Sequence, residues 1–409
     1  MFFLRIILMS LRSLWVHPLR SVLATLGVII GVAAVVAAMA ILEGMSARFA
    51  SGFQSMGSNK LFIMPAVQRR GHRTVGTFDS LKLEDADAIR KECPAVRMAV
   101  PQVNSGGLVR YFSRNTNASI LGTTEAYPKI NNHRVADGEF ITRSDVQAKL
   151  SVAVVGSKVK KELFGGRPAL GEKIKITGLL GSRTFVVIGV MEEKGNIAFT
   201  DVDQQIIIPV TTAMDKLYGM KAVTVILAEA ASPNDADIEQ AKDEIKRMLR
   251  KRHKIRAGQQ DDFQVQAQKE FVAQFAMFQN IVGIVLWSIA GISLVVGGIG
   301  IMNIMLVAVT ERTREIGVRM AMGAQRIDVM RQFLIEACTV SFLGGALGVL
   351  MGWGMAGAIE KLTRVFETVT TGWAVAMALT MATVTGVVSG LYPAWKASRL
   401  DPVEALRYE

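Results

Sequence analysis

The sequence predicts an α-helical membrane protein with four transmembrane helices and a two-lobed α+β domain outside the cytoplasm. Half of the 409 residues are hydrophobic and the mean hydropathy is +0.32, which is too apolar for an ordinary soluble protein. A charge-free run has to reach roughly 20 residues to cross the hydrocarbon core of a bilayer. Runs of this kind occur at residues 21–42, 271–310, 337–359 and 368–395.

The first span follows a predicted interfacial helix at residues 1–20. Arg5 and Arg12 are spaced to lie on one helical face among apolar side chains, as in a helix that rests on the cytoplasmic leaflet. A cleavable signal peptide is the alternative. The apolar run is longer than the h-region of a signal peptide and contains Gly27 and Gly31 in a GxxxG packing pattern. We therefore expect the first span to be retained.

The second run, residues 271–310, is longer than one bilayer crossing and too short for two spans and a polar turn. We predict one helix that continues beyond the membrane as a stalk, and a similar extension of the first span to about residue 57. Apolar side chains recur at helical spacing on both stalks and would let them pair, although the same periodicity also fits packing on the soluble domain. The stalk positions are Met45, Phe49, Phe53, Phe271, Phe275 and Phe278.

Basic residues near the ends of the spans predict the orientation in the membrane. The segments before the first span, after the second and after the fourth are rich in Lys and Arg, whereas the short loop at residues 360–367 has balanced charges. Both termini, including the tail at residues 396–409, are therefore expected in the cytoplasm, in a multi-pass membrane protein. Residues 43–270 would lie in the periplasm or outside the cell. Most of the net charge of +12 lies there, which argues against a nucleic-acid partner.

The insert between the first two spans alternates strand-like and helix-like segments. The predicted strands are residues 60–64, 152–155, 173–176, 185–190, 205–208, 222–227 and 263–268. A helix is predicted at residues 83–91. Strand segments lie on both sides of a shorter β-rich block at residues 137–212. One lobe, formed by residues 58–136 and 213–270, is therefore interrupted by another.

A second helix is predicted after Ser232, which can act as N-cap with Pro233 at the first helical position. The helix runs into a basic segment at residues 246–256. This segment is either a solvated helix terminus or a contact for anionic lipid or a partner.

Motifs for catalysis and metal binding are missing from the sequence. It has no GxxxxGK[ST] loop to cradle phosphates, its 4 histidines are scattered, and its 2 cysteines, Cys93 and Cys338, provide no metal or disulfide framework. Residues 157–160 satisfy SxxK but lack the partner motifs of serine acyl-enzymes. We expect a non-catalytic protein with no cofactor bound to this chain.

The predicted spans contain almost no ionisable residues that could line a polar path. Glycines at GxxxG spacing predict close contacts between helices instead. The packing positions are Gly27, Gly31, Gly344, Gly348, Gly352, Gly386 and Gly390.

A compact charged segment, residues 311–336, connects the second and third spans. Its spacing allows Glu315 to pair with Arg319 and Asp328 with Arg331, and Gly323 predicts a break between two helices. The sequence ERTREIGVRMAMGA in this segment resembles the cytoplasmic coupling segment of the MacB/FtsX superfamily of ABC-transporter permeases. DGEFIT, VAVVGSKVKKELFGG, VVIGV and the C-terminal YPAWKASRLDPVEALRYE also match the MacB-type pattern, so the resemblance covers essentially the whole chain.

The resemblance implies a MacB-type permease without a fused ATPase domain, in which a porter-like periplasmic lobe is split by a distal β-rich lobe. It implies a homodimer in the membrane lipid that works with two copies of an ABC ATPase, and the ATPase would bind ATP and Mg. It leaves open whether a periplasmic adaptor protein and an outer-membrane channel take part. The expected ATPase-coupling residues are Glu311, Arg312, Arg314, Glu315, Arg319 and Gly323.

Two other functions share the four-span topology. FtsX-like proteins transmit signals to envelope hydrolases, and lipoprotein-releasing permeases extract lipoproteins. The two-lobed insert and the MacB-like segments favour export of a substrate from the cell envelope. The sequence does not indicate which substrate.

Overall fold

The computed structural model of the chain describes residues 18–54, 57–70, 73–77, 79–197, 200–363 and 368–407. The chain forms two compact units. The helical unit comprises Met1–Ala47 and Ala276–Glu409, and the α+β unit comprises Arg48–Phe275. Nearly all of the predicted interfacial helix falls outside the described residues.

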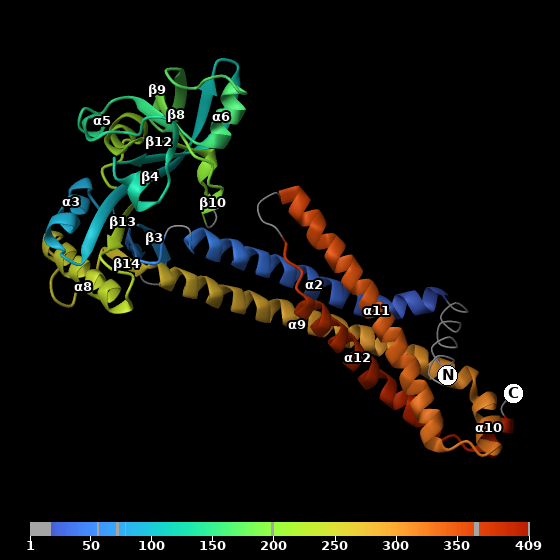
Figure 1. The fold of residues 1–409 in the computed structure, drawn as a ribbon. Helices are drawn as coiled ribbons and strands as arrows, with labels where there is room; N and C mark the ends of the chain where they lie inside the picture. The colour runs from blue at the N-terminus through green and yellow to red at the C-terminus, as the bar shows by residue number, and fades with distance from the viewer. Residues whose placement is uncertain are drawn as a thin grey trace. The chain divides into compact units, whose positions relative to one another are not determined.

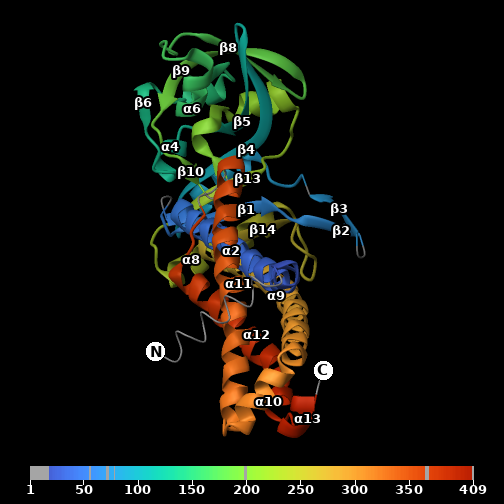
Figure 2. The ribbon, with the colours of Figure 1, turned by 90° about the vertical axis from the view of Figure 1, so that its right-hand side faces the viewer.

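Long apolar helices make up the helical unit (Figures 1 and 2). They are α2 (Pro18–Gln54), α9 (Gln268–Glu311), α11 (Arg326–Thr363) and α12 (Gly372–Ser398), with two short helices, α10 (Thr313–Ala321) and α13 (Pro402–Arg407). In the described part of the chain, 4 helices are long and apolar enough to cross a membrane: Thr25–Gly52, Gln268–Glu311, Arg326–Leu362 and Gly372–Ser398. The second apolar run therefore lies in one continuous helix.

A 10-stranded sheet forms the frame of the α+β unit. Its strands are β1 (Lys60–Pro65), β4 (Val96–Tyr111), β5 (Arg114–Thr123), β6 (Val135–Gly138), β7 (Val152–Val155), β8 (Lys173–Gly178), β9 (Gly181–Met191), β12 (Gln205–Pro209), β13 (Val225–Ala230) and β14 (Phe263–Ala267). The order is β14-β1-β13-β4-β5-β12-β7-β9-β6, and β8 pairs with β4 and β9. Two small hairpins stand apart: β2 (Val67–Arg70) with β3 (Arg73–Thr77), and β10 (Asn196–Ile197) with β11 (Thr200–Asp201).

Strand β4 runs through both halves of this sheet. Its first half pairs with β13, where Val100 lies opposite Leu227, and its second half pairs with β5, where Val109 lies opposite Thr116. β5 then pairs in parallel with β12. The β4–β5 hairpin was not predicted from the sequence. It places strands from before residue 137 in the same sheet as strands from the predicted β-rich block at residues 137–212. The boundaries between the two predicted lobes stay a prediction.

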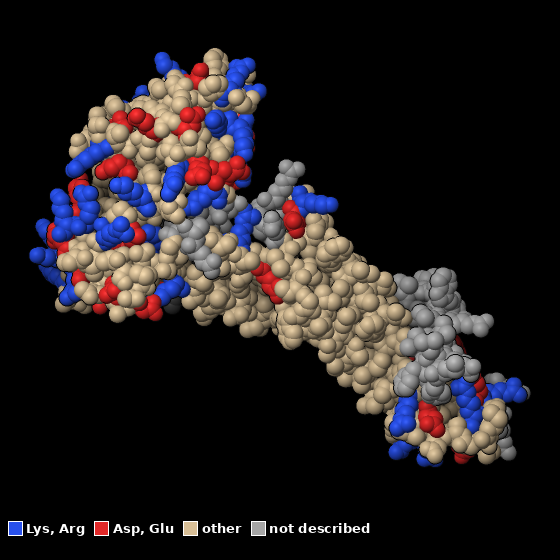
Figure 3. All heavy atoms as spheres, viewed as in Figure 1, with Lys and Arg blue, Asp and Glu red and all other residues tan. Residues whose placement is uncertain are grey.

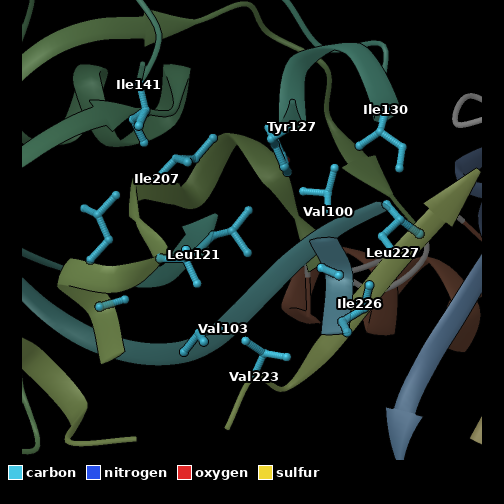
Figure 4. Close-up of a cluster of buried hydrophobic side chains, with 14 of the residues drawn as sticks. Val100, Val103, Leu121, Tyr127, Ile130, Ile141, Ile207, Val223, Ile226 and Leu227 are labelled. Atoms are coloured by element: carbon cyan, nitrogen blue, oxygen red, sulfur yellow. The ribbon is translucent and has the colours of Figure 1, made fainter. Parts of the chain in front are cut away.

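Helices cover the sheet and close its core. α3 (Leu83–Glu92) and α8 (Asp235–Arg252) pack against each other and against β4, β13 and β14. The other half carries α4 (Tyr127–Ile130), α5 (Arg143–Gln147), α6 (Ser157–Phe164), α7 (Val210–Thr212) and the short helical turns Val202–Gln204 and Ala213–Tyr218. Figure 4 shows Val100, Leu121, Ile207 and Leu227 among the buried side chains between the strands. Burial of such a side chain stabilises the fold by about 1.5–3 kcal/mol. The predicted fold class is confirmed.

Helix α8 begins later than the sequence predicted. Its N-cap is Asn234, and the Ser232 hydroxyl accepts a hydrogen bond from the Asn234 amide at 3.3 Å instead of capping the helix. Part of the basic segment at its end is neutralised inside the unit. Arg250 pairs with Asp261, and Arg252 Nε lies 2.9 Å from the buried Asp85.

Two histidines of the α+β unit have opposite pKa shifts. His253 lies between Asp85 and Asp262, at 3.2 Å and 2.9 Å. The hydrogen bond to Asp85 raises the pKa of His253 and the bond to Asp262 adds to this, against the effect of burial. Burial lowers the pKa of His133, although its Nε2 donates to the Glu192 carbonyl at 2.8 Å.

These shifts predict two pH windows for the stability of the α+β unit. The stabilisation from His253 should be complete below the unfolded pKa of about 6.5 and lost as the pH rises through the raised folded value. The stabilisation from neutral His133 should be present above about 6.5 and lost as the pH falls through the lowered folded value. We expect His253→Gln to flatten only the alkaline side of a plot of Tm against pH, and His133→Gln only the acidic side. The opposite assignment in thermal unfolding of the full chain would contradict these shifts.

Candidate functional site

The candidate coupling site lies at the end of the helical unit where α9 turns into α10. Thr313 stabilises this turn because its hydroxyl donates to the carbonyls of Val309 and Thr310 at 3.0 and 2.9 Å. α10 ends before Gly323, whose φ of +100° suits a residue without a side chain. The predicted break at Gly323 therefore separates α10 from α11.

A partly buried ion pair fixes the start of α10 to α11. Arg312 Nη1 lies 3.4 Å from both carboxylate oxygens of Glu336, and Glu336 is buried. Because a buried carboxylate without its cation is costly, the pair holds the turn in one position.

Arg319 makes the second connection between α10 and α11. It forms an ion pair with Glu315 one turn earlier, which is the pairing the spacing predicted, and its Nη1 donates to Gln332 Oε1 of α11 at 2.8 Å. Asp328 and Arg331, the other predicted pair, form no ion pair in the described range 200–363. Both side chains are exposed there.

The inner face of α10 packs on α13. Ile316 is buried, and a Cβ added at Gly317 would lie 2.7 Å from the Cβ of Ala405 in α13. Only glycine allows the two helices to approach this closely. The residues of the C-terminal YPAWKASRLDPVEALRYE segment thus support α10 directly.

The outer face of α10 and the turn after it are exposed. Met322 is 78 % exposed, Val318 and Ile327 are also exposed, and Arg314 and Glu315 lie beside them. Figure 3 shows Lys, Arg, Asp and Glu side chains gathered at this end of the helical unit, in contrast to the nearly uncharged length of the helices. Apolar side chains within a rim of charges are typical of a surface that another protein covers.

Helix contacts inside the unit depend on glycines. At the crossing of α2 and α9, a Cβ on Gly27 would lie 2.6 Å from Gly297 Cα, whereas one on Gly31 would meet side chains of Ser293 and Leu294 at 3.3 Å. Gly297 was not predicted, although the sequence has three glycines close together, Gly297, Gly298 and Gly300.

α11 contacts α2 through Gly348 and Gly352. Their added Cβ atoms would lie 2.8 Å and 2.7 Å from the carbonyl oxygens of Ile29 and Ala33. Gly344 makes only ordinary contacts, with nothing closer than 3.6 Å.

α12 contacts α11 through Gly386 and Gly390. Added Cβ atoms there would lie 2.7 Å from Ser341 Cβ and 2.4 Å from Ala337 Cβ. The Ser341 hydroxyl also donates to the Ala382 carbonyl, a contact that the sequence did not indicate.

The stalk positions differ in their surroundings. The rings of Phe49 and Phe275 stack with centroids 4.1 Å apart, and Phe271 meets Phe62 of β1 edge to face at 5.2 Å. Met45 is half-buried, whereas Phe278 is 56 % exposed. The side chain of Phe53 lies outside the described residues. The described residues contain no group of His, Cys, Asp and Glu side chains placed to hold a metal ion.

The sequence as a whole matches two protein families. Residues 21–248 match the MacB-like periplasmic core domain, and residues 287–402 match the FtsX-like permease C-terminal domain. The chain is thus an ABC-transporter permease with four apolar helices in the inner membrane and its α+β unit outside the cytoplasm. It belongs to the MacB-like family, as its motifs predicted.

Relatives of known name agree with this family. The macrolide export ATP-binding/permease protein MacB of Bdellovibrio bacteriovorus is 37% identical over 401 residues, which cover 97% of this chain and 61% of the relative. The pyoverdine export ATP-binding/permease protein PvdT of Pseudomonas savastanoi pv. phaseolicola is 38% identical and covers 97% of this chain and 58% of its own length. The chain therefore spans about 60% of these relatives. The crystal structure of the periplasmic region of MacB from Actinobacillus actinomycetemcomitans covers 55% of this chain and 95% of its own, at 20% identity and a TM-score of 0.44.

Proposed function

We propose that the chain is the permease subunit of a homodimeric MacB-type transporter that couples ATP hydrolysis by an ABC ATPase to movement of its α+β units and export of a substrate. The observation that carries this proposal is the exposed outer face of α10, held on α11 by Arg312 and Arg319. In this proposal ATP and Mg bind to two ATPase copies docked on this face. The relatives MacB and PvdT are named as export proteins, which favours transport over FtsX-like signalling.

Force would travel from α10 into α9 and α11 and through the stacked Phe49 and Phe275. Whether an adaptor protein and an outer-membrane channel complete the pathway depends on the partners of this chain. The close glycine contacts favour helices that move as packed bodies over helices that line a polar path.

Reversing one charge on α10 should uncouple the ATPase. We expect Glu315→Arg to weaken co-purification of the ATPase by about tenfold. The new arginine would repel Arg319 one turn later and disturb the outer face of α10. The double variant Glu315→Arg with Arg319→Glu restores the ion pair with its charges exchanged, and it should recover association of the ATPase. Unchanged association and ATP turnover in Glu315→Arg would show that this face is not the contact.

Phe275→Ala should leave association of the ATPase normal and reduce export in cells.

The proposed orientation places both termini in the cytoplasm. In a chain whose two native cysteines are replaced by alanine, Glu193→Cys and Leu362→Cys should react with a membrane-impermeant maleimide in intact cells. Met322→Cys should react only after the cells are opened. All three side chains are exposed, and the experiment is done in cells without the ATPase, so failure to react reports the membrane and not cover by protein. Labelling of Met322→Cys in intact cells would reverse the orientation.

A further inference from the structure

The helical unit contains a groove of about 580 Å³ between α2 and α9. Leu42 and Glu43 of α2 and Gly283, Ile284 and Trp287 of α9 are among its lining residues. The groove lies at the ends of these helices that are next in sequence to the α+β unit. In the orientation proposed above, this is the outer end of the spans.

Glu43 gives this groove its charge. Its Oε1 accepts a hydrogen bond at 3.1 Å from Thr371, the N-cap of α12. Its Oε2 is shielded from water and receives no hydrogen bond, and Glu43 forms no ion pair with a Lys, Arg or His of the described chain. A carboxylate with an uncompensated oxygen is costly to bury, and Glu43 is the first charged residue after the apolar run at residues 21–42.

We propose that the groove binds the ammonium head group of an amphiphile, with the cation beside Glu43 and the hydrocarbon chain against the apolar wall. Trp287 also lines the groove, and aromatic rings attract ammonium groups, while Leu42 and Ile284 offer apolar surface. The groove has no Lys or Arg in its lining, so an anionic head group finds no cationic partner there. Its volume is that of a small-molecule pocket, roughly 300–1,000 Å³. The ligand is either an aminophospholipid of the bilayer or a free cationic amphiphile.

Fluorescence of Trp287 can test this proposal in the full-length chain. Trp15, Trp353, Trp373 and Trp395 are replaced by phenylalanine, and the protein is placed in nanodiscs of phosphatidylglycerol, which has no ammonium group. Brominated phosphatidylethanolamine, brominated phosphatidylglycerol and a brominated single-chain alkylammonium are then titrated as quenchers. We expect the ammonium compounds to reach half-maximal quenching at an about tenfold lower mole fraction than brominated phosphatidylglycerol, since a hydrogen bond to a charged group is strong.

Two variants separate the site from general effects. Glu43→Gln keeps an acceptor for Thr371 and should abolish the preference. Gly283→Leu should also abolish it, because a side chain there enters open space, and Gly291→Leu, equally open on the same helix, should not. Preference for the phospholipid identifies a lipid ligand, and preference for the alkylammonium alone identifies a free amphiphile. Three results would overturn the proposal. The three compounds could quench equally, a second copy could cover Trp287 and prevent quenching, or the preference could survive Glu43→Gln.

Discussion

Replacing Lys60 by methionine is expected to lower the free energy of unfolding of the α+β unit by about 3–5 kcal/mol, because it leaves the Glu229 carboxylate buried without its cation. Lys60 of β1 and Glu229 of β13 lie opposite each other in the sheet, with Nζ 3.1 Å from Oε1. Lys60 is only 3% exposed. Burial lowers its pKa and Glu229 opposes that shift, so each charge depends on the other.

Two further variants make this measurement specific. The double variant Lys60→Met with Glu229→Met removes both charges and should recover most of the loss. Lys149→Met breaks an ion pair with Asp215 whose side chains are 51% and 49% exposed, and should cost only about 0–1 kcal/mol. The stabilities of the three variants are compared by thermal unfolding, followed by the circular dichroism signal of the sheet. A double variant as unstable as Lys60→Met alone would show that packing, and not charge, explains the loss.

Adding a methyl group at Gly348 or Gly352 should destabilise the helical unit by about 1–3 kcal/mol for each substitution. The new Cβ would lie 2.8 or 2.7 Å from a carbonyl oxygen of α2, so α2 and α11 have to move apart. Gly354→Ala and Gly357→Ala are matched controls in the same helix, because nothing lies within 4 Å of a Cβ there. The controls should be neutral or slightly stabilising, since alanine favours a helix by about 1 kcal/mol over glycine.

Tryptophan fluorescence isolates this effect. All 5 tryptophans lie outside residues 48–275, so a thermal transition seen by tryptophan reports the helical unit without the α+β unit. Equal destabilisation by Gly352→Ala and Gly357→Ala would show that α11 does not depend on close contact with α2.

Much of the architecture could be predicted because membrane spans are local features. A charge-free run is visible without knowledge of its neighbours, and α9 and α12 lie close to the predicted ranges. β4 and β5 were missed because Asn104 to Gly107 resemble a loop in sequence. Only pairing with β13, β5 and β8 makes this segment a strand, and such pairing is a property of the folded chain.

The candidate coupling site shows the same division. The Glu315–Arg319 pair lies within one helical turn and could be predicted from spacing. The partners of Arg312 and Gly317, which are Glu336 and Ala405, lie on other helices. The role of the basic segment at the end of α8 was left open for the same reason, because the carboxylate of Asp85 that binds Arg252 comes from α3.

The length of β4 has a consequence for cooperativity. One strand of 16 residues serves both halves of the sheet, so neither half can release it without exposing Val100 or Val109, which are buried in the common core. Amide hydrogens in the two halves therefore have to exchange through a shared opening and not through independent local ones. A domain that opens only as a whole passes a displacement from one edge strand to the other without losing it to partial unfolding.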